Sequence, residues 1–213
     1  MTATHKRWEP KWPFRSSEAV VAHEHVYLLG YWKPGKGSQI HICQQSDLQI
    51  ERWLEQGGTI LLQEQQAPEA IRNVYIWKMR ATLKAADKCS DPPTELLGKS
   101  FAAALRRCSE VATEEALEDC IDALTRFPGV GLRLASAFLY WLRPNEFQVI
   151  DRRSTEALDL SFEPSDYTVS NYLWWCEYAR DRAATLCMSL RTIDRALFTY
   201  HKLLEKGHVL PMK

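Results

Sequence analysis

The sequence predicts an all-α protein. Apolar residues recur at helical spacing along most of the 213 residues, and an alternation that suits a strand occurs only briefly, at Ile40 and Ile42. Proline and glycine punctuate the helical segments rather than apolar strands. We therefore expect helices packed on one another in one unit, residues 1–213, that is long enough to bury a substantial core.

Helical segments in the amino-terminal half are expected at about 17–31, 47–55, 68–83 and 97–108. Pro68 suits the first turn of its helix, which carries an apolar face through Ile71 and Met79. Lys78 lies off this face, a position that suits solvent or a phosphate equally well. The loop at 31–38 mixes aromatic and basic residues with glycine, so it is either a surface connection or a contact to nucleic acid.

The segment 113–143 predicts two helices joined by a tight turn. Thr113 can cap the first helix, which should end at Phe127 because a proline follows. The turn reads Pro128-Gly129-Val130-Gly131, and apolar periodicity then resumes until Pro144. Two glycines permit positive φ angles and leave backbone N–H groups open at the start of a helix, where a phosphate can bind. An ordinary turn between two helices is the alternative interpretation.

Asp151 lies 20 residues after Gly131 and begins another helical segment, 151–158. Aspartate is a common N-cap, and a capping carboxylate is held in place while still able to face a ligand. Two more helices are expected at about 166–186 and 193–204. Trp174 and Trp175 lie in the first of these, where large aromatic residues suit a core better than a nucleic-acid base.

The hairpin glycines, the small residues 135–137 and the spacing to Asp151 together resemble the helix-hairpin-helix (HhH-GPD) DNA glycosylase superfamily, which includes endonuclease III and the adenine-mismatch and alkylpurine glycosylases. The resemblance covers about 113–160. It implies two helical lobes, one at about 32–145 that includes the hairpin, 113–143, and one made of 1–31 and 146–213, with double-stranded DNA bound between them. In this family the hairpin holds a DNA phosphate, often with a monovalent cation, and the aspartate is catalytic.

The resemblance assigns catalysis to Asp151 and DNA binding to the following residues: Gly129, Val130, Gly131, Arg133, Arg152 and Arg153. Arg133 stands where lyase-competent members carry lysine. A guanidinium stays protonated and cannot form a Schiff base, and no lysine occurs between Lys99 and Lys202. We therefore expect a monofunctional glycosylase that uses water as the nucleophile in base excision.

Charge and cysteine content limit the alternatives. The net charge is zero, which argues mildly against nucleic-acid binding, although five arginines and only two acidic residues fall between 126 and 153. The six cysteines show no CxxC spacing and the last is Cys187, so we expect reduced thiols, no iron–sulfur cluster and no metal.

The sequence shows no signal peptide and no apolar run long enough to cross a membrane. We expect a soluble, intracellular monomer that acts on DNA and needs no cofactor. Two alternatives remain: a helix-hairpin-helix module that binds DNA without cutting it, and an all-α protein unrelated to nucleic acid. The identity of the excised base does not follow from the sequence.

Overall fold

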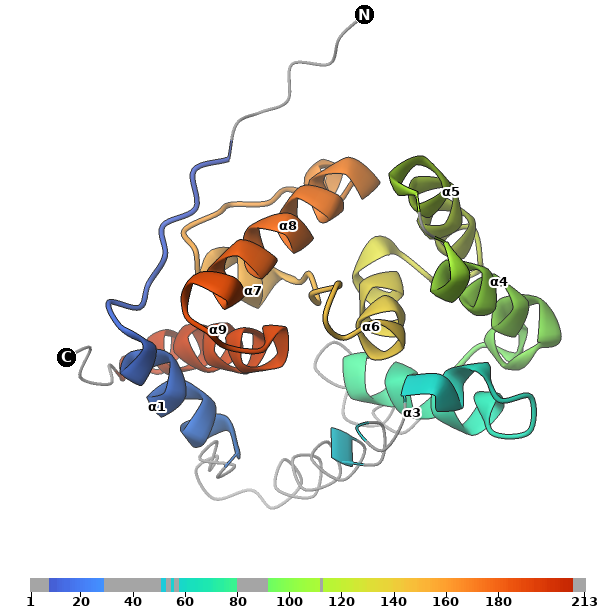
Figure 1. Cartoon of the computed structure of the whole chain (residues 1–213), viewed down its shortest axis with the longest axis horizontal. Helices are drawn as coiled ribbons and strands as arrows, with labels where there is room; N and C mark the ends of the chain where they lie inside the picture. Colours follow the sequence, from blue (N-terminus) through green and yellow to red (C-terminus); the bar gives the residue numbers. More distant parts are fainter. Residues whose placement is uncertain are drawn as a thin grey trace, which may run out of the picture.

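The computed structural model describes residues 8–28, 51–52, 55, 58–79, 92–111 and 113–208. Every regular element within these ranges is a helix, as Figure 1 shows, which confirms the all-α prediction. The loop predicted at 31–38 and the alternating residues Ile40 and Ile42 lie outside the described ranges. No helix in the described part of the chain is long and apolar enough to span a membrane.

The observed helices follow the predicted segments, except that most of the helix predicted at 47–55 lies outside the described ranges. The α-helices are α1 (Ser17–Leu28), α3 (Ala67–Met79), α4 (Lys99–Glu110), α5 (Glu114–Thr125), α6 (Leu132–Leu142), α7 (Arg152–Glu156), α8 (Val169–Thr185) and α9 (Leu190–Glu205). Three short 3-10 helices are η1 (Gly58–Leu62), η2 (Thr94–Leu97) and η3 (Pro164–Asp166). Side-chain oxygens cap α5, α7, α8 and α9, where they accept the free backbone N–H three residues on; the caps are Thr113, Asp151, Thr168 and Ser189.

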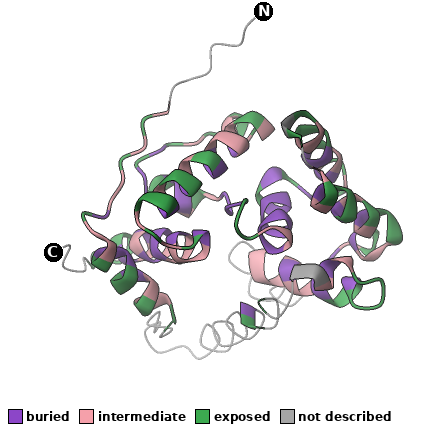
Figure 2. Cartoon of the chain, viewed as in Figure 1, coloured by how far each residue is buried: buried purple, intermediate pink, exposed green. Residues whose placement is uncertain are grey.

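The helices pack in two groups. α3, α4 and α5 contact α6, whereas α1, α7 and α8 contact α9, and α5 also touches α8. Residues Leu132 and Leu134 to Trp141 of α6 are all buried, so most of this helix lies inside the molecule (Figure 2), whereas Arg133 in its first turn is exposed.

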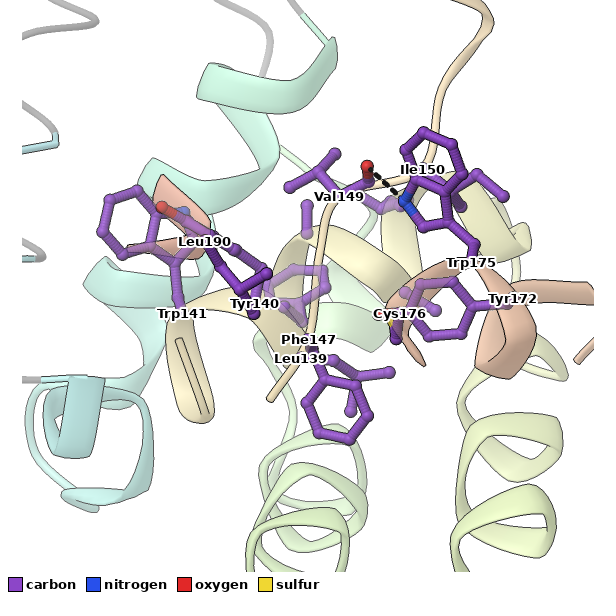
Figure 3. Close-up of a cluster of buried hydrophobic side chains, with 14 of the residues drawn as sticks. Leu139, Tyr140, Trp141, Phe147, Val149, Ile150, Tyr172, Trp175, Cys176 and Leu190 are labelled. Atoms are coloured by element: carbon purple, nitrogen blue, oxygen red, sulfur yellow. Dashed lines mark hydrogen bonds between the residues drawn. The ribbon is translucent and has the colours of Figure 1, made fainter. Parts of the chain in front are cut away.

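A buried, non-helical segment joins α6 to α7 and ends at Asp151. Its residues 147–150 are at most 3% exposed, so their backbone polar groups need partners inside the protein. The indole Nε1 of Trp175 donates to the carbonyl of Val149 at 3.2 Å, as Figure 3 shows, and the N–H of Ile150 donates to Ser136 Oγ at 3.2 Å. The segment is thus hydrogen-bonded to α8 on one side and to α6 on the other.

The prediction that the adjacent tryptophans serve the core is confirmed for Trp175, which is fully buried. Trp174 is partly buried and stacks on Tyr178. The described cysteines are free thiols, of which Cys187 is exposed and the others are buried: Cys108, Cys120, Cys176 and Cys187.

Candidate functional site

The hairpin between α5 and α6 differs in one respect from its prediction. Gly129 has a φ of 76°, the left-handed region that favours glycine, but Gly131 has a φ of −84°, which any residue adopts. The positive φ that both glycines permit is thus adopted by Gly129 alone of the two. The Val130 N–H donates to the Phe127 carbonyl at 3.0 Å, so this amide is engaged within the turn.

The exposed end of the hairpin is open to a ligand. Gly131 is the N-cap of α6 and has no side chain that could accept the first N–H groups of the helix. A Cβ placed on Gly131 would meet nothing within 4 Å, so there is room at this position for a side chain or a ligand. The Leu134 N–H donates to the Gly131 carbonyl at 2.9 Å, whereas the N–H groups of Gly131, Leu132 and Arg133 have no backbone partner among the described residues. The positive end of the helix dipole lies at the same place, and Gly131 itself is exposed.

Asp151 is fixed by a reciprocal cap at the start of α7. Its Oδ1 accepts the backbone N–H of Ser154 at 3.0 Å, and the Ser154 hydroxyl accepts the backbone N–H of Asp151 at 3.0 Å. The predicted capping role is confirmed. Because only Oδ1 is used by the helix, the second oxygen is available for another contact.

Lys78 supplies that contact. Its Nζ lies 3.1 Å from Asp151 Oδ2, although the two residues are 73 positions apart, and the two side chains are 11% and 26% exposed respectively. Burial opposes ionisation of the carboxyl, but the ammonium of Lys78 and the N–H of Ser154 more than offset it and lower the pKa of Asp151 to about 2. Asp151 is therefore a carboxylate at neutral pH.

The sequence did not single out Lys78 as a partner of Asp151. Its position off the apolar face of α3 indicated only an exposed or phosphate-facing cation, whereas its side chain is mostly buried. Lys78 is distant from Asp151 in the sequence, and the contact between them forms because α3 packs against α6.

A charged network is buried beside this pair. The Glu51 carboxylate is 1% exposed and lies 2.5 Å from Arg191 Nη2 and 3.2 Å from Arg195 Nη2. Trp77, the neighbour of Lys78 on α3, donates its indole N–H to Glu51 at 2.9 Å, and Tyr27 donates its hydroxyl to the same oxygen at 2.5 Å. Burial opposes ionisation of Glu51, yet Arg191 prevails and the pKa of Glu51 is lowered.

Asp194 is part of the same network. It accepts a hydrogen bond from Gln148 Nε2 at 3.1 Å and one from Arg191 Nη1 at 3.3 Å. Burial raises the pKa of Asp194 to about 6, against the attraction of Arg191. From the sequence, Asp194 lies off the apolar face of its helix and could pair with Arg152 or Arg153; in the structure it pairs with Arg191 instead.

Most of the arginines near the hairpin are paired with acids. Arg152 lies 3.6 Å from Glu156 and 3.4 Å from Glu205, and Arg153 lies 4.0 Å from Glu205 and over the ring of Phe198. These contacts hold α7 against α9, so Arg152 and Arg153 already have a structural role.

Arg126 pairs with Asp122 at 2.7 Å, and Arg143 pairs with Glu146. The local surplus of positive charge in the sequence is thus largely neutralised. Arg133 differs: it is exposed, its guanidinium lies 5.3 Å from the ring centre of Tyr167, and it has no acidic partner among the described residues.

The site has no metal-binding geometry in its described part, where no three His, Cys, Asp or Glu side chains come together as a possible metal site. No protein-family model matches the sequence, and neither the curated proteins nor the solved structures contain a significant match. Asp151, Lys78 and the hairpin are therefore the features of this protein from which a function can be inferred.

Proposed function

We propose that this protein is a DNA glycosylase that hydrolyses the N-glycosidic bond of a damaged or modified base in double-stranded DNA, with Asp151 as the catalytic carboxylate. One observation carries the proposal: Asp151 is ionised, partly exposed and fixed at the end of a buried segment that is hydrogen-bonded to α6. Because α6 begins at the glycine hairpin, a phosphate on the hairpin and a sugar at Asp151 would be held by one rigid unit.

The chemistry suits a fixed carboxylate. As the base leaves a flipped-out nucleotide, positive charge builds up on the sugar, and a nearby negative charge stabilises it. The same carboxylate can orient water and accept its proton. An Asp151 pKa of about 2 supports this role, because the group carries its charge at every pH at which duplex DNA is ordinarily handled.

The two-lobed HhH-GPD arrangement belongs to the same proposal. It is supported by the packing of α3, α4 and α5 on α6 and of α1, α7 and α8 on α9. In this scheme the Gly131 amide and the first amides of α6 hold the phosphate, with or without a monovalent cation, and Arg133 adds a charged contact. The Val130 amide contributes nothing, since it is used within the turn.

Base release by wild type and by Asp151→Asn tests the proposal. The two proteins are incubated with duplexes that carry alkylated, oxidised, deaminated or mismatched bases, and free base is measured by mass spectrometry. We expect release by wild type and a loss of at least 100-fold in Asp151→Asn, with DNA affinity retained. Asp159→Asn, a change at an exposed carboxylate that pairs with Lys11, is the matched control. Equal activity of wild type and Asp151→Asn would refute the assignment.

A DNA-binding module without catalysis is the second candidate, since an open hairpin can hold a phosphate whether or not Asp151 acts. It predicts salt-sensitive binding and no product on any substrate. Arg133→Ala should then reduce the dependence of log K on log salt by about one unit, whereas Arg126→Ala should change it little, because Arg126 pairs with Asp122.

A further inference from the structure

Lys78 is held firmly beside Asp151. The adjacent Trp77 anchors the end of α3, since its indole donates to Glu51 and its ring stacks on Tyr140 with centroids 6.3 Å apart. Among the described residues, Asp151 is the only hydrogen-bond partner of the Lys78 ammonium. An ammonium has three N–H donors, and no other described residue accepts a hydrogen bond from this one.

The ion pair creates a conflict for the proposed reaction. A carboxylate that faces an ammonium at 3.1 Å has much of its negative charge compensated, which weakens its ability to stabilise a sugar cation. A neutral base, in turn, needs a proton, because it takes the electron pair when the C1′–N bond breaks. Transfer of one proton from Lys78 to the base would neutralise the base and would also remove the positive charge that compensates Asp151.

We infer that Lys78 is the general acid of the reaction and protonates the base as it leaves, an assignment that rests on the proposed glycosylase function. The C1′–N bond breaks with its electrons going to the base, and a Lys78 N–H bond supplies the proton. Lys78 becomes a neutral amine, so the negative charge of Asp151 faces the sugar cation uncompensated.

Water then completes the cycle. It attacks C1′, and Asp151 takes its proton. That proton passes across the 3.1 Å contact from Asp151 Oδ2 to the Lys78 amine, which restores the ammonium and the carboxylate. The net reaction consumes one water and yields the free base and an abasic sugar, with no further reactant.

The neighbouring groups are less suited to this step. Both oxygens of Asp194 are engaged, one by Gln148 and the other by Arg191. Arg153 lies against Glu205 and Phe198, and a guanidinium does not release its proton. Lys78 is the cation in the described part of the chain that contacts the carboxylate directly.

The test compares bases that need a proton with bases that do not. Hypoxanthine and uracil leave a neutral nucleotide as anions, whereas 7-methylguanine is cationic in DNA and leaves as a neutral molecule. Release of each base is measured for wild type, Lys78→Met and Lys78→Arg. Lys78→Arg retains the charge beside Asp151 but cannot supply a proton, and Lys99→Met, a change at an exposed lysine 3.8 Å from Glu64, is the control.

We expect both Lys78 variants to lose about 10²- to 10⁴-fold on the neutral bases and less than about 10-fold on 7-methylguanine, with Lys99→Met equal to wild type. If wild type accepts only neutral bases, its substrate is compared with a fluorinated derivative, whose anion is a weaker base and should show the smaller loss. Melting temperatures and DNA affinities show whether each variant is folded.

Several results would overturn the assignment. These are equal losses on both classes of base, no loss in either Lys78 variant, or wild-type activity confined to cationic bases. Borohydride trapping of wild type, but not of Lys78→Arg, on abasic DNA would also overturn it, because Lys78 would then be an amine nucleophile. Failure of wild type to release any base would instead refute the proposed function itself.

Discussion

The hydroxyl of Ser136 accepts a hydrogen bond from the backbone N–H of Ile150 at 3.2 Å and donates one to the Arg133 carbonyl at 2.9 Å. Ser136 and Ile150 are both fully buried, and this contact links the helix of the hairpin to the segment that carries Asp151. The Ser136 hydroxyl thus forms a direct hydrogen-bonded link between the helix that begins at the hairpin and the segment that ends at Asp151.

Ser136→Ala should lower the free energy of unfolding by about 1–3 kcal/mol, because it leaves the buried N–H of Ile150 without a partner. Urea denaturation measures the change. Ser109→Ala removes a more accessible hydroxyl that donates to the Arg106 carbonyl within its own helix, and it should cost less than about 0.5 kcal/mol. Equal costs for the two variants would contradict the role given to Ser136.

The two hairpin glycines should respond oppositely to alanine. Gly129→Ala forces a Cβ into the left-handed region and should destabilise the protein by about 1–2 kcal/mol. A methyl group on Gly131 meets no protein atom within 4 Å, so Gly131→Ala should leave the free energy of unfolding unchanged or slightly higher. If the hairpin holds a phosphate as proposed, the same methyl group should weaken DNA binding. Thermal melting and a fluorescence-anisotropy titration with duplex DNA separate the two effects.

Low pH should reduce the free energy of unfolding, in part because Asp151 becomes protonated. Its pKa of about 2 in the folded protein lies below the unfolded value of about 3.9, so the unfolded state binds more protons between these values. The stabilisation is complete above about pH 4 and is lost as the pH falls through 2. The difference in unfolding free energy between wild type and Asp151→Asn should therefore shrink by about 2 kcal/mol from pH 5 to pH 2. A difference that stays constant would exclude a depressed pKa.

Glu51→Gln should be among the most damaging single changes. It removes the buried negative charge that compensates Arg191 and Arg195, and this should lower the free energy of unfolding by about 3–5 kcal/mol. Glu55→Gln is the matched control, because Glu55 also contacts Arg195, at 2.8 Å, but is largely exposed and should cost at most about 1 kcal/mol. Chemical denaturation of both variants at neutral pH gives the comparison.

Local patterns in the sequence predicted the helices and the cap at Asp151, because apolar spacing, proline and capping side chains act over a few residues. They could not predict Lys78 next to Asp151, since that contact brings together residues 73 positions apart. The sequence did not predict the role of Glu51 for a similar reason, since its partners, Arg191 and Arg195, lie on the last described helix.

The excess of arginines over acidic residues between 126 and 153 did not predict which arginines are unpaired, for a related reason. Arg152 and Arg153 read as part of a basic cluster, but Glu205 on α9 pairs with both. Arg133, in contrast, is exposed, and its neighbour in the fold, Tyr167, carries no negative charge that would neutralise it at neutral pH. Whether a surface arginine is available to a ligand therefore depends on long-range packing.

Helix α9 supplies the partners of segments that are synthesised much earlier. It packs along α1 and provides the guanidinium groups that compensate Glu51. While the chain grows on the ribosome, residues 17–55 emerge before α9 exists, and a carboxylate without a counter-ion resists burial. Burial of Glu51, and of Ala19 and Val20 on the face of α1, is therefore expected to be completed only after α9 has been synthesised.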